Sequence, residues 1–99
     1  MIAGEEKKGL NDSKYLDKEV FQPMSRVYLL ANVTPGKERD IRDTLRGING
    51  IKDADVITGQ YDILVTLEAK DTNEIFNKIL KKVRKVRGLT RTETFVAVE

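Results

Sequence analysis

The chain has 99 residues with no cysteine and no histidine, and its 18 basic and 16 acidic side chains leave a formal net charge of +2. This length allows one domain with a modest core, and the missing residue types exclude disulfides, thiol chemistry and the usual histidine and zinc sites. The nearly balanced charge gives no strong field for nucleic acid. We therefore expect a non-enzymatic domain without cofactor or metal, stabilised by association with copies of itself.

Residues 1–24 are polar, with mixed charges, and they lack the apolar core of a secretory signal. No apolar run in the chain reaches membrane-spanning length. We predict an N-terminal tail that either stays partly disordered or forms a short helix, and a cytoplasmic protein that does not bind membranes.

A strand, a helix and two further strands are predicted after the tail. Residues 27–33 (VYLLANV) form a compact apolar run that is typical of a strand. Residues 37–48 carry apolar side chains at helical spacing with charges between them, which predicts a helix packed by one face. Residues 51–58 and 61–68 have strand patterns, and Gly59-Gln60 between them predicts a tight hairpin.

The rest of the chain predicts a second helix and a last strand. Asp71 and Glu74 resemble a capping box at the start of the helix. Its apolar stripe is predicted to consist of Ile75, Phe76, Ile79, Leu80, Val83 and Val86. Gly88 ends the helix, and residues 89–98 are rich in Thr and Val, as expected of a strand.

The order βαββαβ over residues 25–99 predicts an α+β, ferredoxin-like sandwich, in which a four-stranded antiparallel sheet carries two helices on one face. Both faces of this sheet are apolar, because Val27 and Leu29 lie on one side of the first strand and Tyr28 and Leu30 on the other. One helical layer covers only one face. We expect a dimer that packs sheet against sheet; the alternative is a tail folded over the open face.

Few side chains point to catalysis. Asp53 and Asp55 share one strand face, a spacing that is equally typical of a solvated edge. Residues 78–87 (KILKKVRKVR) are strongly basic, but their interleaved apolar residues favour a solvated helix face over a nucleic-acid site. We expect no catalytic residue and no direct DNA binding. The rival classes are a small dimeric α/β-barrel enzyme, a plain assembly protein, and a nucleic-acid binder that uses the basic helix.

Two short motifs go beyond these general patterns. Thr58-Gly59-Gln60-Tyr61-Asp62 occupies the hairpin, and residues 88–94 (GLTRTET) open the last strand. Together they resemble the T-G-x-Y-D and G-V-x-x-T-x-T motifs of the feast/famine (Lrp/AsnC) ligand-binding domain, also called the RAM domain, and the resemblance covers about residues 25–98. Full regulators of this family place a DNA-binding helix-turn-helix before the domain. Residues 1–24 cannot hold one, so we expect a stand-alone form.

The resemblance implies dimers formed through the sheets, further assembly up to an octamer of four dimers, and an amino-acid effector bound between dimers. The ligand-binding residues that it implies are Thr58, Gly59, Tyr61, Asp62, Thr92 and Thr94. Asp62 would accept from the ligand's ammonium, while backbone N–H groups near Gly59 and the threonine hydroxyls would hold its carboxylate. The implied function is to sense a metabolite and to modulate transcription by assembly with itself or with full-length Lrp/AsnC regulators.

These residues also have ordinary structural explanations. Gly59 can serve only the turn, Tyr61 only the core, and Thr92 and Thr94 only the strand. The sequence leaves both interpretations open.

Overall fold

The computed structural model describes residues 24–98, so the predicted tail lies almost entirely outside the described residues. The elements are β2 (Ser25–Val33), α2 (Glu38–Arg46), β3 (Ile51–Val56), β4 (Ile63–Ala69), α3 (Thr72–Glu74), the π-helical segment η1 (Ile75–Ile79), α4 (Leu80–Arg84) and β5 (Leu89–Val96). None of the helices in this part of the chain is long and apolar enough to span a membrane.

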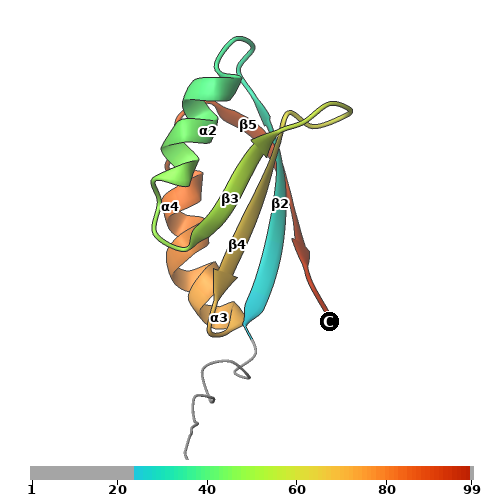
Figure 1. Cartoon of the computed structure of the whole chain (residues 1–99). Coiled ribbons are helices and arrows are strands. Elements are labelled where there is room, and N and C mark those ends of the chain that lie inside the picture. Colours follow the sequence, from blue (N-terminus) through green and yellow to red (C-terminus); the bar gives the residue numbers. More distant parts are fainter. Residues whose placement is uncertain (1–23, 99) are drawn as a thin grey trace, which may run out of the picture.

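The four strands form one antiparallel sheet in the order β3-β4-β2-β5. Helix α2 and the helical stretch from α3 to α4 lie on the same side of this sheet (Figure 1). The ferredoxin-like sandwich predicted from the order of elements is therefore confirmed.

The core lies between the sheet and the helices. Alternate residues of the central strands point into it, as the period of two in a strand requires. Its members are, from the strands, Val27, Leu29, Ala31, Val33, Ala54, Ile63, Val65, Leu67 and Ala69, and, from the helices, Ile41, Leu45, Ile75, Ile79, Leu80 and Val83. Each large aliphatic side chain buried here contributes about 1.5–3 kcal/mol to stability.

The second helix departs from the prediction, because its middle turn is π-helical. The N–H of Leu80 donates to the carbonyl of Ile75, five residues earlier, so one extra residue is accommodated in that turn. Ile75, Ile79 and Leu80 thereby share the buried face. Phe76 was predicted in the apolar stripe, but it turns outward and is 37% exposed.

The hairpin between β3 and β4 is longer than the predicted two-residue turn. Strand β3 ends at Val56 and β4 begins at Ile63, so residues 57–62 form a loop. The N–H of Ile57 donates to the carbonyl of Asp62 at 2.8 Å, which closes this loop at its base. Gly59, at φ +117°, has the positive φ that favours glycine.

Strand β3 is one edge of the sheet, and an arginine from α2 lies along it. Arg46 Nε donates to the carbonyl oxygen of Ala54 at 2.9 Å. The same guanidinium lies 3.5 Å from Asp53 and 3.6 Å from Asp55. These two aspartates thus lie at a solvated, ion-paired edge of the sheet, which is one of the two interpretations that their spacing allowed.

Candidate functional site

The hairpin motif lies at one end of the sheet. The loop of residues 57–62 projects from the same end of the molecule as the turn that follows β2 (Figure 1). Thr58 and Gly59 are exposed near its tip, whereas Tyr61 is buried and Asp62 is half-buried at its base. The motif therefore presents two exposed residues and anchors two others.

Asp62 fastens the hairpin to β2. Its Oδ2 accepts a hydrogen bond from the N–H of Val33 at 2.9 Å and lies 3.4 Å from the amide nitrogen of Asn32. Its own N–H donates to the carbonyl of Ala31 at 2.9 Å. No hydrogen bond within residues 24–98 uses its other carboxylate oxygen, Oδ1, so this carboxylate combines a structural contact with an acceptor to spare.

Tyr61 ties the hairpin to the last strand. Its hydroxyl donates to Glu93 Oε1 at 2.5 Å, and the guanidinium carbon of Arg91 lies 5.6 Å from the centre of its ring. The hydrogen bond to Glu93, followed by burial, raises the pKa of Tyr61 above its ordinary value. The phenol therefore stays protonated at neutral pH. Its hydroxyl can donate a hydrogen bond and its ring can provide an apolar contact, but it cannot act as a base.

Thr92 and Thr94 lie on the other face of β5. They pair with Ala31 and Leu29, which point toward the helices, whereas Glu93 pairs with Leu30 on the uncovered face. Thr92 is exposed and Thr94 is half-buried, and neither hydroxyl makes a hydrogen bond to residues 24–98. Within one chain the six predicted residues thus do not converge on one pocket.

A hollow of about 480 Å³ borders Asp62 at the base of the hairpin. The hydrophobic Val56 and Ile57 form part of its wall, and the first turn of α2 forms the rest. That turn contributes Glu38, Arg39 and Asp40, and among residues 24–98 its N-cap residue Lys37 forms no side-chain cap. Side chains of both signs beside the N-terminal turn of a helix are what a zwitterionic ligand requires.

Sequence reasoning missed the part of this hollow contributed by α2. Arg39 is distant from Asp62 in the sequence, and only the fold brings them together. The signal was the charged first turn directly after Pro35-Gly36. Within residues 24–98, no group of three carboxylate, cysteine or histidine side chains is arranged to hold a metal ion.

The sheet face opposite the helices is largely apolar. Tyr28 and Leu30 on β2, with Leu64 and Thr66 on β4, are half-buried, and Phe95 on β5 is 44% exposed. None of the described helices lies over this face (Figure 1). It is the face that the sequence predicts to be covered by a second molecule.

A charged group borders the end of this face away from the hairpin. Arg26 Nε donates to Glu68 Oε2 at 2.7 Å, and Lys52 Nζ lies 3.6 Å from the same oxygen. The hydrogen bond from Arg26 is the main reason that the pKa of Glu68 lies below its ordinary value.

The sequence matches one family, described as the Lrp/AsnC ligand binding domain, over residues 26–99. It is also 42% identical, over 52 residues, to homocitrate synthase from Saccharolobus islandicus. That match covers 52% of this chain and spans only 11% of the length of the enzyme.

Solved structures share the fold. Protein PHS023 from Pyrococcus horikoshii is 28% identical with a TM-score of 0.69, and the match covers 76% of this chain and 90% of that one. The transcriptional regulator NMB0573 from Neisseria meningitidis, solved as a complex with L-Met, has a TM-score of 0.66 over 97% of this chain and 60% of its own. Its sequence identity is 12%, so that likeness shows the fold alone.

Proposed function

Because the chain belongs to the family of Lrp/AsnC ligand-binding domains, we propose that it binds an amino acid or a related metabolite and modulates transcription by assembling with itself or with full-length relatives. The family and the regulator neighbours point to a regulatory protein rather than an enzyme.

The observation that carries this proposal is the hollow beside Asp62. Its lining combines the carboxylates of Asp62, Glu38 and Asp40 with the guanidinium of Arg39 and an apolar wall formed by Val56 and Ile57. An α-amino acid offers the matching ammonium, carboxylate and side chain. The L-Met complex of a regulator with the same fold supports a ligand of this class.

The positions of the threonines favour a site shared between molecules. The hydroxyls of Thr92 and Thr94 lie on the face of β5 opposite to the hydroxyl of Tyr61. If all six predicted residues serve the ligand, some must do so from a neighbouring copy. Ligand binding at such a contact stabilises the assembled form and couples occupancy to assembly.

A thermal-shift screen against the twenty common amino acids tests ligand sensing. A ligand present at about 100 times its Kd stabilises the folded state by about 2.7 kcal/mol, which raises the Tm of a domain of this size by roughly 10 °C or more. We expect one or a few amino acids to produce such a shift. A flat panel would contradict amino-acid sensing.

Asp62→Asn tests the hollow itself. Asparagine keeps an oxygen that can accept from the N–H of Val33 but loses the charge that would hold an ammonium. We expect this variant to fold and to lose the shift, whereas Asp43→Asn, on the exposed surface of α2, keeps it. Equal shifts in both variants would remove Asp62 from the site.

We also propose that two copies associate through the apolar sheet face. Leu30→Glu places a charge at the centre of this face, next to Glu93. Light scattering should then report a lower mass than that of the wild type, with an unchanged far-UV circular dichroism spectrum. Val98→Glu is the control, because Val98 is 92% exposed and lies beyond β5. An unchanged mass for Leu30→Glu would contradict this interface.

The homocitrate synthase match favours a second candidate function, in which the domain regulates a biosynthetic enzyme instead of transcription. Affinity capture with the tagged full chain, with and without the effector found in the screen, separates the two. Recovery of a DNA-binding relative supports transcriptional regulation, and recovery of a biosynthetic enzyme supports the alternative.

A further inference from the structure

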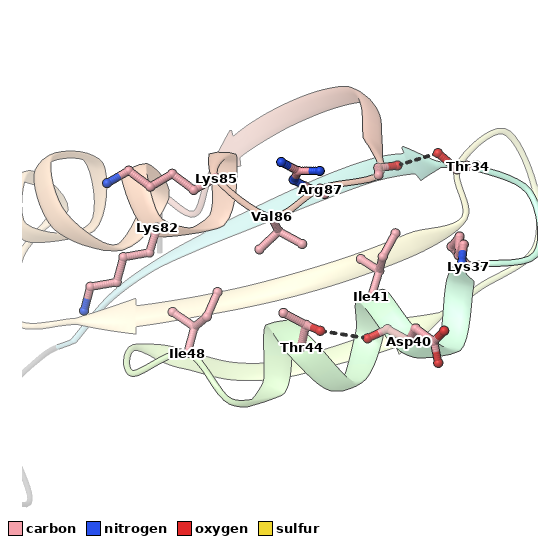
Figure 2. Close-up of a pocket in the computed structure, with 11 residues that line it drawn as sticks. Thr34, Lys37, Asp40, Ile41, Thr44, Ile48, Lys82, Lys85, Val86 and Arg87 are labelled. Carbon is pink, nitrogen blue, oxygen red and sulfur yellow. Dashed lines mark hydrogen bonds between the residues drawn. The ribbon is translucent and has the colours of Figure 1, made fainter.

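A second hollow lies on the helical side of the molecule. It is a groove of about 710 Å³ between α2 and the end of α4, and none of the six predicted site residues lines it. Figure 2 shows Ile41 and Ile48 pointing from the α2 side toward Val86 on the other side. These three apolar side chains form its floor.

The rim of the groove is strongly cationic. Lys37 lies at the start of α2, and Lys82, Lys85 and Arg87 lie along the opposite wall. Asp40 is the one acidic residue in the lining. None of the ion pairs formed within residues 24–98 involves any of the four cations. The groove thus keeps a surplus of positive charge above an apolar floor.

The size and the lining together indicate the class of occupant. The volume lies within the range of roughly 300–1,000 Å³ that is typical of small-molecule sites. A docked helical peptide would require a row of apolar contacts over several turns, whereas the floor offers three side chains. A cationic rim that forms no ion pair with residues 24–98, next to an apolar floor, complements a molecule with an anionic head and an apolar body.

We propose that this groove binds a small amphiphilic carboxylate. Its apolar body lies on Ile41, Ile48 and Val86, and its carboxylate accepts hydrogen bonds from Lys82 and Lys85. The aliphatic stems of these lysines extend the apolar wall while their ammonium groups reach the head. The lining of this groove shares only Asp40 with the hollow at the hairpin, and the proposal does not depend on the proposed effector site.

The test is a titration of the ¹⁵N-labelled full chain with decanoate below its micelle concentration, followed by amide chemical shifts. Saturable shifts are expected at Ile41, Ile48 and Val86. Decanol and decyltrimethylammonium carry the same chain with a neutral and a cationic head. We expect decanol to bind at least about tenfold more weakly, which corresponds to about 1.4 kcal/mol, and the cation to produce no saturable shifts.

Helix α4 provides a matched pair of variants. Lys82→Gln with Lys85→Gln removes two charges from the groove, whereas Lys81→Gln with Arg84→Gln removes two exposed charges that do not line it. We expect the first pair to weaken decanoate binding by about tenfold or more and the second to leave it within about twofold. Equal losses would show unspecific attraction to a basic helix and overturn the proposal.

Two other results would also overturn it. If the groove amides shift on raising the protein concentration alone, a second copy of the chain occupies the groove. If an acidic amphipathic peptide shifts them but decanoate does not, the groove is a docking site for a protein partner. If decanoate shifts no amide of the groove although the amino-acid screen finds a ligand, the groove proposal is wrong and the hairpin proposal is unaffected.

Discussion

Replacing Gly88, the first residue of the last-strand motif, is expected to destabilise the fold more than replacing Gly59 in the hairpin motif. Gly88 has φ +100°, and a Cβ added there would lie 2.6 Å from Cδ1 of Ile41. Gly59 has a similar φ of +117°, but a Cβ there would meet no atom within 4 Å. The two positions therefore share the backbone strain of a positive φ and differ in steric clash.

The expected magnitudes follow from this difference. A non-glycine residue in the left-handed region costs about 1–2 kcal/mol, which is the expected loss for Gly59→Ala. Overpacking in a well-packed core costs about 1–3 kcal/mol more, so Gly88→Ala should lose roughly 2–5 kcal/mol. The clashing atom is the end of the Ile41 side chain, which is 5% exposed and lines the groove between α2 and α4, so a shift of Cδ1 into that groove would place the loss toward the lower end of this range.

Urea unfolding followed by circular dichroism, at one fixed protein concentration, measures both losses. The double variant Gly88→Ala, Ile41→Val sharpens the test, because valine lacks the Cδ1 that clashes. Ile41→Val alone costs about 0.5–1.5 kcal/mol, yet the double variant should lose less than the two single variants together. Equal losses at Gly88 and Gly59, or strictly additive losses in the double variant, would refute the packing argument.

Two further predictions concern the second helix and the charged end of the open face. Asp71 Oδ1 accepts a hydrogen bond from the N–H of Glu74 at 2.8 Å and so caps the helix. Asp71→Ala should therefore lower the free energy of unfolding in urea by about 1 kcal/mol, whereas Asp71→Ser, which can still cap, should lower it little. Equal losses in the two variants would exclude a capping role. Because Arg26 holds the pKa of Glu68 below its ordinary value, this pair stabilises the fold above that value and the contribution is lost as the pH falls through the lowered pKa. Glu68→Gln should therefore flatten the loss of stability on acidification, and identical pH profiles would contradict this.

The strands and the core were predictable because strand periodicity acts locally. The alternation of Val27, Leu29 and Ala31 with half-buried neighbours is visible in the sequence and persists in the sheet. The π-helical turn was not predictable. It depends on how Ile75 and Leu80 fit together against the sheet, and an α-helical spacing placed Phe76 in the stripe instead.

The candidate site was predictable only where a motif is continuous in the sequence. The hairpin from Thr58 to Asp62 is such a motif, and one of its residues, Asp62, lines a hollow. The contribution of Arg39 arises from a contact between α2 and the hairpin that no local pattern encodes. The separation of Tyr61 and Thr92 onto opposite faces likewise follows from the pairing of β5 with β2.

The arginine along β3 has a consequence for how the protein avoids aggregation. A bare sheet edge is a template for the strands of other molecules, and polymerisation at both edges would yield fibres. Here Arg46 already occupies the carbonyl of Ala54, and Asp53 and Asp55 add charge beside it. Strand β3 is thus a blocked end. Strand addition is therefore disfavoured at β3 relative to β5, which makes growth of the sheet from both edges less favourable.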